Sequence, residues 1–212
     1  MNTKPRLQYA ICVSGAASGD TVEADKELAG RLGAAIAKRG HITITGATVG
    51  LPFYAAKGAK ENGGMSIGFS PAASIRDHLR RYRLPVQYFD FINYTGMHYV
   101  GRDTHLVQSA DAVITIGGRF GSLHEFVTAI ELRTPCGILT GSSGTADTVS
   151  ELMRVLEAPR DTNVIFDDNP ENLVGRLVDM LDETYKDIAK ELEKEEHWFL
   201  TNDKAKDDSH RG

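Results

Sequence analysis

A glycine-rich turn, followed by a hydroxyl group and a carboxylate, is the part of this sequence best suited to bind a ligand. An apolar, β-branched run over residues 113–116 leads into the turn, and a helical pattern over residues 123–132 follows it. The polar and glycine residues of this junction are Gly117, Gly118, Gly121, Ser122 and Glu125. The first N–H groups of a helix lack intrahelical partners and the helix dipole is positive there, so the junction is typical of a phosphate site.

Arg102 and Glu125 are the two charged residues that we predict to act on the ligand. The planar guanidinium of Arg102 suits a phosphate or a base, and the alternative is a surface ion pair with Asp103. Glu125 can stabilise positive charge on a ribose or orient a water molecule, as carboxylates do in glycoside hydrolysis. Its alternative role is that of a first-turn glutamate that suits the helix dipole.

Two earlier glycine loops are expected to meet the same ligand. Residues 14–19 and 46–50 each follow a short apolar strand. Loops at the carboxyl ends of parallel strands converge on one crevice where the strand order reverses. We therefore predict that Ser14, Gly15, Gly46 and Gly50 also contribute to binding.

The motifs that are missing narrow the ligand class. The sequence has no Walker pattern, none of its loops has the spacing G-x-G-x-x-G, and the second strand ends without the acidic residue that holds a cofactor ribose. These absences disfavour ATP on a P-loop and a dinucleotide. They favour a mononucleotide or a similar phosphorylated small molecule, without a further cofactor or metal.

The elements that must position these residues alternate along the chain. Strands are predicted over residues 9–13, 41–45, 65–69, 86–91, 113–116, 137–139 and 163–166, and helices over residues 21–38, 52–60, 97–109, 123–132 and 170–181. Such alternation predicts a doubly wound, mostly parallel, Rossmann-like α/β fold. We expect a single domain over residues 1–187 and a charged tail over residues 188–212, helical or disordered.

One basic segment interrupts this alternation. Residues 72–85 carry Arg76, Arg80, Arg81 and Arg83 and are interpreted as a mobile connection or a short helix. A solvated basic loop and a lid that contacts an anion are both open interpretations.

Composition limits the compartment and the partners. The chain has 212 residues and a net charge of −5, which argues against a broad surface for nucleic acid. Cys12 and Cys136 lie in apolar runs and are expected to be buried, reduced thiols without metal-ligand spacing. No run approaches the ~20 apolar residues of a membrane span. We expect a cytoplasmic protein that binds neither membrane nor nucleic acid.

The run from Arg102 to Glu125 resembles the signature of the LONELY GUY family, whose members are often mislabelled lysine decarboxylases. That signature is an arginine followed, after a strand, by P-G-G-x-G-T-x-x-E, and the resemblance extends over residues 9–181. It implies release of a base from nucleoside 5′-monophosphates, leaving ribose 5-phosphate, by a dimer or larger homo-oligomer. Under this resemblance Arg102 and Glu125 match the catalytic pair, and the Gly117 to Ser122 turn matches the phosphate site.

Three departures bear on the substrate. Ile116 stands in place of the proline, Ser122 in place of the threonine, and Asp103 in place of a lysine. Without the proline, the pattern is similar to a sister branch that includes molybdenum cofactor carrier proteins, which bind a phosphorylated pterin without turnover. The sequence therefore predicts a nucleoside 5′-monophosphate phosphoribohydrolase, with a non-catalytic carrier of a phosphorylated ligand as the alternative.

Overall fold

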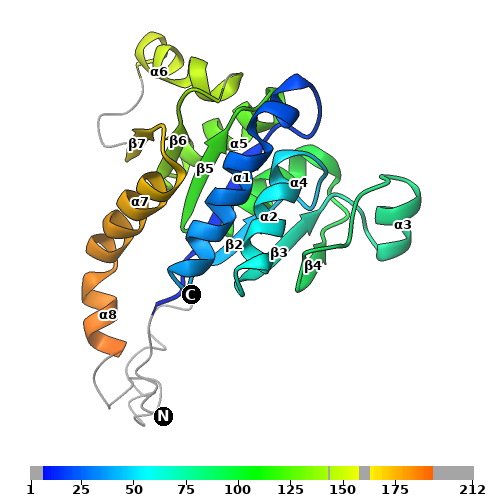
Figure 1. Cartoon of the computed structure of the whole chain (residues 1–212), viewed down its shortest axis with the longest axis horizontal. Helices are drawn as coiled ribbons and strands as arrows, with labels where there is room; N and C mark the ends of the chain where they lie inside the picture. Colours follow the sequence, from blue (N-terminus) through cyan, green and yellow to red (C-terminus); the bar gives the residue numbers. More distant parts are fainter. Residues whose placement is uncertain (1–6, 143, 158–162, 193–212) are drawn as a thin grey trace, which may run out of the picture.

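Seven parallel strands form one sheet in the computed structural model, which describes residues 7–192 apart from residues 143 and 158–162. The order across the sheet is β4-β3-β2-β1-β5-β6-β7 (Figure 1). The strands are β1 (Ala10–Gly15), β2 (Ile42–Thr45), β3 (Met65–Ser70), β4 (Phe91–Tyr94), β5 (Ala112–Ile116), β6 (Cys136–Leu139) and β7 (Val164–Asp167). This arrangement confirms the predicted Rossmann-like α/β fold.

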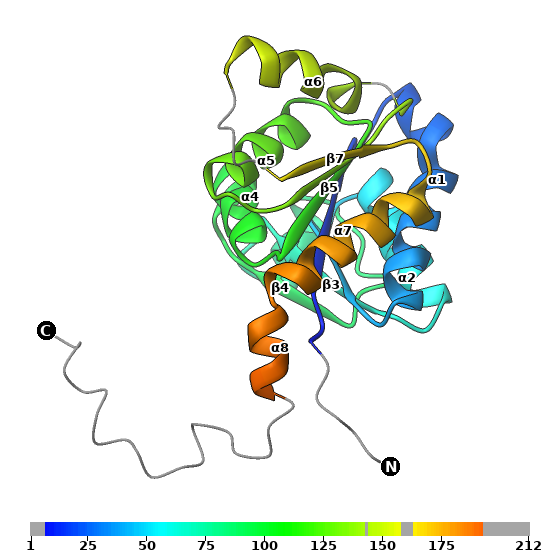
Figure 2. The ribbon, with the colours of Figure 1, turned by 90° about the vertical axis from the view of Figure 1, so that its left-hand side faces the viewer.

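Helices cover both faces of the sheet. They are α1 (Asp20–Lys38), α2 (Leu51–Glu61), α3 (Ile75–Arg80), α4 (His98–Gln108), α5 (Phe120–Glu131), α6 (Thr145–Val155), α7 (Pro170–Thr184) and α8 (Lys186–Leu192). Figure 2 shows α1, α2 and α7 on one face and α4 and α5 on the other. No helix among the described residues is long and apolar enough to cross a bilayer.

The central strands are buried on both faces, so their apolar residues serve two cores. In β1, Ile11 and Val13 pack with residues of α1 and α7, whereas Cys12 packs on the opposite face with Leu106 of α4 and Phe126 of α5. This alternation follows from the two-residue period of a strand, and burial on both faces explains the continuous apolar runs. Cys12 and Cys136 are buried free thiols, as predicted.

The strand order reverses between β1 and β5. From β1 the chain proceeds outward through β2, β3 and β4, and then crosses back to place β5 on the other side of β1. Ser14 pairs with Thr115 and Gly15 with Ile116, so the loops after these two strands start side by side. This is the switch point where doubly wound sheets bind ligands.

The fourth strand differs from the prediction. A strand over residues 86–91 is wrong, because the fourth strand runs from Phe91 to Tyr94. Phe89 instead places its ring against Gly68 of β3, 3.2 Å from where a Cβ would stand. The Asp90 carboxylate accepts a hydrogen bond from the Ser66 N–H, at 2.8 Å, and regular pairing begins only beyond it.

The basic segment contains the short helix α3, one of the two predicted alternatives. Ser74 caps it by accepting a hydrogen bond from the Asp77 N–H. His78 is fully buried and anchors the segment through the Ser70 hydroxyl, at 2.8 Å, and the Pro85 carbonyl, at 2.9 Å. The segment projects from the body of the molecule beside β4 (Figure 1).

Candidate functional site

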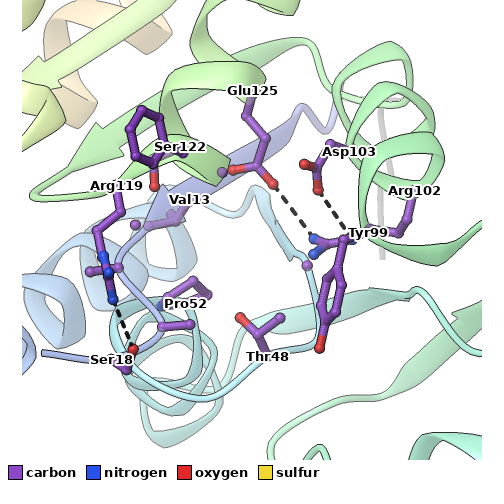
Figure 3. A pocket seen from close by; sticks show the side chains of 16 residues that line it. Val13, Ser18, Thr48, Pro52, Tyr99, Arg102, Asp103, Arg119, Ser122 and Glu125 are labelled. Atoms are coloured by element: carbon purple, nitrogen blue, oxygen red, sulfur yellow. Dashed lines mark hydrogen bonds and ion pairs between the residues drawn. The ribbon is translucent and has the colours of Figure 1, made fainter. Parts of the chain in front are cut away.

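A cleft of about 380 Å³ lies at the switch point, at the carboxyl ends of β1, β2 and β5. Its walls come from the loops after β1 and β2, from α4 and from the start of α5. The residues that line it are Val13, Gly15, Ala16, Ala17, Ser18, Gly46, Thr48, Pro52, Tyr99, Arg102, Asp103, Arg119, Phe120, Gly121, Ser122 and Glu125. Figure 3 shows these side chains around one opening.

Arg102 lies between two carboxylates in the wall of this cleft. Its Nε is 3.3 Å from Oδ1 of Asp103, and its Nη1 is 3.5 Å from Oε1 of Glu125 (Figure 3). All three residues are buried, and the Ser14 hydroxyl donates a hydrogen bond to Glu125 Oε2. The ion pair with Asp103, predicted as the alternative for Arg102, is therefore present, but it is buried in the cleft wall and does not lie on the surface.

The Glu125 carboxyl is the group whose ionisation this environment alters most clearly. Burial, together with the neighbouring Asp103, raises its pKa to about 7, against the opposing effects of the Arg102 charge and of the Ser14 hydrogen bond. Near neutral pH, Glu125 therefore exists in both protonation states. Such a group can accept or donate a proton without a large cost.

Asp103 links the arginine to a histidine behind the cleft. Its Oδ2 is 3.1 Å from Nδ1 of His124, while its other oxygen faces Arg102. His124 is half-buried and does not line the cleft. Asp103 thus holds the guanidinium at Nε, while Glu125 faces Nη1.

The glycine turn is held from behind by α6. The N–H groups of Thr145 and Ala146 donate to the carbonyls of Gly118 and Gly117, at 3.2 and 3.0 Å. The Thr145 hydroxyl also donates to the Arg119 carbonyl, at 2.9 Å. The turn carbonyls are therefore occupied on the α6 side.

The open end of α5 faces the cleft. The helix begins at Phe120, and its first N–H groups, including those of Gly121 and Ser122, have no intrahelical partner. Both residues line the cleft. The geometry therefore provides the unpaired N–H groups and the positive helix end that a phosphate requires.

Arg119 connects the turn to the loop after β1. Its Nη1 lies 3.3 Å from the Ser18 hydroxyl across the cleft (Figure 3). Unlike Arg102, it has no carboxylate within 4.0 Å among the described residues. Its charge is thus available to an anionic group on the α5 side of the cleft.

The predicted site residues divide into two groups. Those that line the cleft are Gly15, Gly46, Arg102, Gly121, Ser122 and Glu125. Those that lie behind it are Ser14, Gly50, Gly117 and Gly118. Gly50 serves loop packing, because a Cβ there would meet the Ala16 carbonyl oxygen at 2.3 Å.

Sequence reasoning did not identify Tyr99, Thr48 or Pro52 as site residues. The helical spacing offered a signal for Tyr99, which precedes Arg102 by three residues and so shares its helix face. Among the described residues that line the cleft there is no arginine from the α3 segment. The described part of the chain also has no cluster of three or more histidine, cysteine or acidic side chains suited to a metal ion.

Comparison with known proteins identifies the family. The model of the SLOG cluster4 family matches residues 8–174. This chain belongs to the SLOG cluster4 family. An uncharacterized protein from Archaeoglobus fulgidus is 31% identical over 144 residues, which are 68% of this chain and 86% of that protein.

Two solved structures similar to this SLOG cluster4 chain are molybdenum cofactor proteins. The molybdenum cofactor binding protein from Rippkaea orientalis is 26% identical with a TM-score of 0.68, covering 84% of this chain and 99% of that one. A Moco carrier protein from Chlamydomonas reinhardtii is 25% identical, also with a TM-score of 0.68 and the same coverage. These similarities support a relationship to the branch that includes molybdenum cofactor carrier proteins, which the replacement of the motif proline by Ile116 also indicates.

The fold itself is shared more widely. DNA processing protein A from Helicobacter pylori, which binds single-stranded DNA, has a TM-score of 0.56 at 17% identity and covers 81% of each chain. At that identity the likeness concerns the fold alone.

Proposed function

We propose that this chain binds a phosphorylated heterocyclic small molecule in the cleft and holds it intact, as a carrier of a phosphorylated pterin of the molybdenum cofactor type. The observation that carries the proposal is the opposition of two anchors in one cleft. The open N-terminus of α5 with Arg119 lies on one side and the buried Arg102 lies on the other, with Glu125, further along α5, beside Arg102 (Figure 3). A phosphate suits the first anchor, and the hydrogen-bonding edge of a heterocycle suits the second.

The charge balance favours this orientation. Arg102 is flanked by Asp103 and Glu125, so two carboxylates compensate its charge and leave little attraction for a phosphate. Arg119 carries no such compensation. The likeness to molybdenum cofactor binding and carrier proteins supports the pterin among the possible heterocycles.

The test determines which small molecule co-purifies with the protein and whether the protein alters that molecule. Protein purified from a host that makes molybdenum cofactor is denatured, and the released material is examined for pterin fluorescence and for molybdenum by elemental analysis. We expect both in near-stoichiometric amounts, and we expect the bound material to persist unchanged during incubation. Arg119→Ala is expected to lose most of the cargo. Protein that carries neither pterin nor molybdenum, or that degrades the cargo, contradicts the carrier proposal.

A second candidate is a nucleoside 5′-monophosphate phosphoribohydrolase, and the observation that favours it is Glu125. Its carboxyl faces the cleft beside Arg102 with a pKa of about 7. In this reaction the bond between ribose C1′ and the base nitrogen breaks, water adds its oxygen to C1′, and the base leaves with a proton. Glu125 would stabilise the positive charge on the ribose and orient the water, while Arg102 orients the substrate.

The enzyme candidate is tested with a panel of nucleoside 5′-monophosphates that includes cytokinin ribotides. Release of free base is followed by chromatography, with Glu125→Gln and Glu125→Ala in parallel. Release that disappears in both variants establishes the hydrolase. Equal release from wild type and variants, or no release from any nucleotide, contradicts it.

The proposed setting is a cytoplasmic homo-oligomer that does not act on nucleic acid. A net charge of −5 supports the last point, since it argues against a broad cationic surface for nucleic acid. Light scattering coupled to size-exclusion chromatography measures the oligomeric state, and a filter-binding assay with single-stranded DNA at low salt checks for nucleic-acid binding.

A further inference from the structure

Tyr99 is an aromatic side chain in the cleft wall that belongs to neither hydrophobic core. It lies in the first turn of α4, lines the cleft, and is 46% exposed. Figure 3 places it on the side of the cleft opposite Arg119 and Ser18, close to Arg102 and Thr48. A ring left open in a concave site is available to a flat partner.

The Tyr99 ring is held in place by its neighbours. The ring of Tyr82 meets it edge to face, with centroids 5.6 Å apart and planes at 80°. The Tyr82 hydroxyl is 2.7 Å from Nδ1 of His98, the residue before Tyr99. On another side, the Arg102 guanidinium carbon lies 5.9 Å from the Tyr99 ring centroid. These contacts restrict the ring, so stacking on it costs little additional side-chain entropy.

Phe120 is a second aromatic side chain of the same cleft, and its surroundings differ from those of Tyr99. It also lines the opening, but it is 87% exposed, and no ring contact is found for it among the described residues. It lies at the start of α5, on the side where the phosphate anchor is. Tyr99, on the opposite side of the cleft, is the aromatic side chain that a flat group anchored by a phosphate at the start of α5 would meet by extending across the cleft.

We propose that Tyr99 is the stacking platform for the planar heterocycle of the ligand, and that Tyr82 is the positioning residue that holds the platform. The inference rests on the proposed function, because it takes the phosphate to lie at the start of α5. It narrows the ligand class to a fused, flat heterocycle joined to one phosphate, as in a pterin phosphate or a purine 5′-monophosphate. The cleft of about 380 Å³ is in the size range of sites for one such molecule.

The experiment measures separately how the heterocycle end and the phosphate end of the ligand contribute to binding. GMP is the probe for the complete ligand, because guanine shares the 2-amino-4-oxo ring of a pterin, and ribose 5-phosphate is the probe for the phosphate end alone. Dissociation constants of both are measured by calorimetry for wild type, Tyr99→Ala, Tyr99→Phe and the control Phe91→Ala. Loss of a base–aromatic stack corresponds to about a five- to hundredfold weakening of GMP binding in Tyr99→Ala.

Ribose 5-phosphate should bind Tyr99→Ala as it binds wild type, and Tyr99→Phe should keep the wild-type affinity for GMP. Phe91→Ala should also keep that affinity, because Phe91 is an exposed aromatic residue that does not line the cleft. Tyr82→Ala should weaken GMP binding by a smaller factor than Tyr99→Ala, and Tyr82→Phe should restore part of that loss.

Equal GMP affinity in wild type and Tyr99→Ala overturns the stacking role of Tyr99 while leaving the phosphate site in place. An equal loss of both probes in Tyr99→Ala assigns the residue a structural role only. Wild-type protein that binds neither probe overturns the proposed function together with this inference.

Discussion

Gly46 leaves the space that the guanidinium of Arg102 fills. A Cβ on Gly46 would stand 1.7 Å from Nη1 and 2.6 Å from Cζ of that arginine. The backbone of Gly46 does not lie in the left-handed region, so the requirement for glycine is one of space. The loop after β2 therefore sets the position of the Arg102 guanidinium in the cleft.

Substitution Gly46→Ala should displace Arg102 and leave Asp103 and Glu125 without their shared cation. We expect binding of GMP to weaken at least about tenfold and the free energy of unfolding to fall by about 0.5–3 kcal/mol. Calorimetry and urea denaturation measure the two effects. Gly30→Ala is the matched control, because a Cβ there would meet nothing closer than the Tyr54 carbonyl oxygen at 3.9 Å. Unchanged binding in Gly46→Ala would mean that Arg102 does not contribute to the site.

Gly118 combines a left-handed backbone with a close neighbour. Its φ is 106°, and a Cβ would lie 2.7 Å from Cβ of Ser122. Gly141 has a φ of 75° but nothing within 4 Å of a Cβ, so Gly141→Ala carries the backbone strain without the clash. We expect both alanine variants to be less stable than wild type and only Gly118→Ala to lose ribose 5-phosphate binding. Retention of that binding in Gly118→Ala would argue against the phosphate site at this turn.

Glu125 should make stability depend on pH in a defined window. Its pKa is about 7 in the folded protein and near 4.5 ordinarily, so between these values the unfolded chain releases a proton that the folded chain keeps. This group's contribution to the free energy of unfolding therefore decreases as pH rises from about 4.5 to about 7, and it is constant above that range. Urea midpoints of wild type should fall relative to those of Glu125→Gln across the window.

Glu151 supplies the control for that measurement. It is exposed, and its hydrogen bond with Arg154 lowers the pKa of its carboxyl below the ordinary value. It therefore titrates below the window, and Glu151→Gln should run parallel to wild type between pH 5 and 7. A parallel course for Glu125→Gln as well would mean that Glu125 is ionised throughout the window.

The two thiols should be inert in the native protein. Burial raises the pKa of Cys136 to about 12 and that of Cys12 well above its usual range. Because the thiolate is the reactive form, iodoacetamide at pH 8 should label neither residue until urea unfolds the chain. Mass spectrometry counts the labels, and rapid labelling of folded protein would show that the cores open on the timescale of the experiment.

The sequence predicted the fold well where periodicity is strong. The helices of the βαβ units and the strands of the sheet centre lie within a few residues of their predicted positions, because long apolar patterns define them. The helix α6 was not predicted, because a polar run follows Gly144, although Ala146, Val149, Leu152 and Met153 keep the helical spacing. Of these, Ala146, Val149 and Met153 face the core beside β5 and β6, and the local sequence does not show which strands they pack against.

The site was predicted in part for a similar reason. Arg102 and Glu125 were predicted to act together from their charges and from the motif that contains them, and the structure places Nη1 of Arg102 3.5 Å from Oε1 of Glu125. The support of Tyr99 by Tyr82 depends on how the α3 segment folds back on α4, and no local pattern encodes that contact. The sharing of Arg102 between two carboxylates likewise depends on distances that spacing does not give.

The bonds from α6 to the glycine turn bear on how fast a ligand binds. Since Thr145 and Ala146 already hold the carbonyls of Gly118 and Gly117, the turn is fixed in place before any ligand arrives. Little conformational freedom is then lost on association, and no slow rearrangement precedes the contact. The cleft should therefore fill in a single kinetic phase whose observed rate rises linearly with ligand concentration.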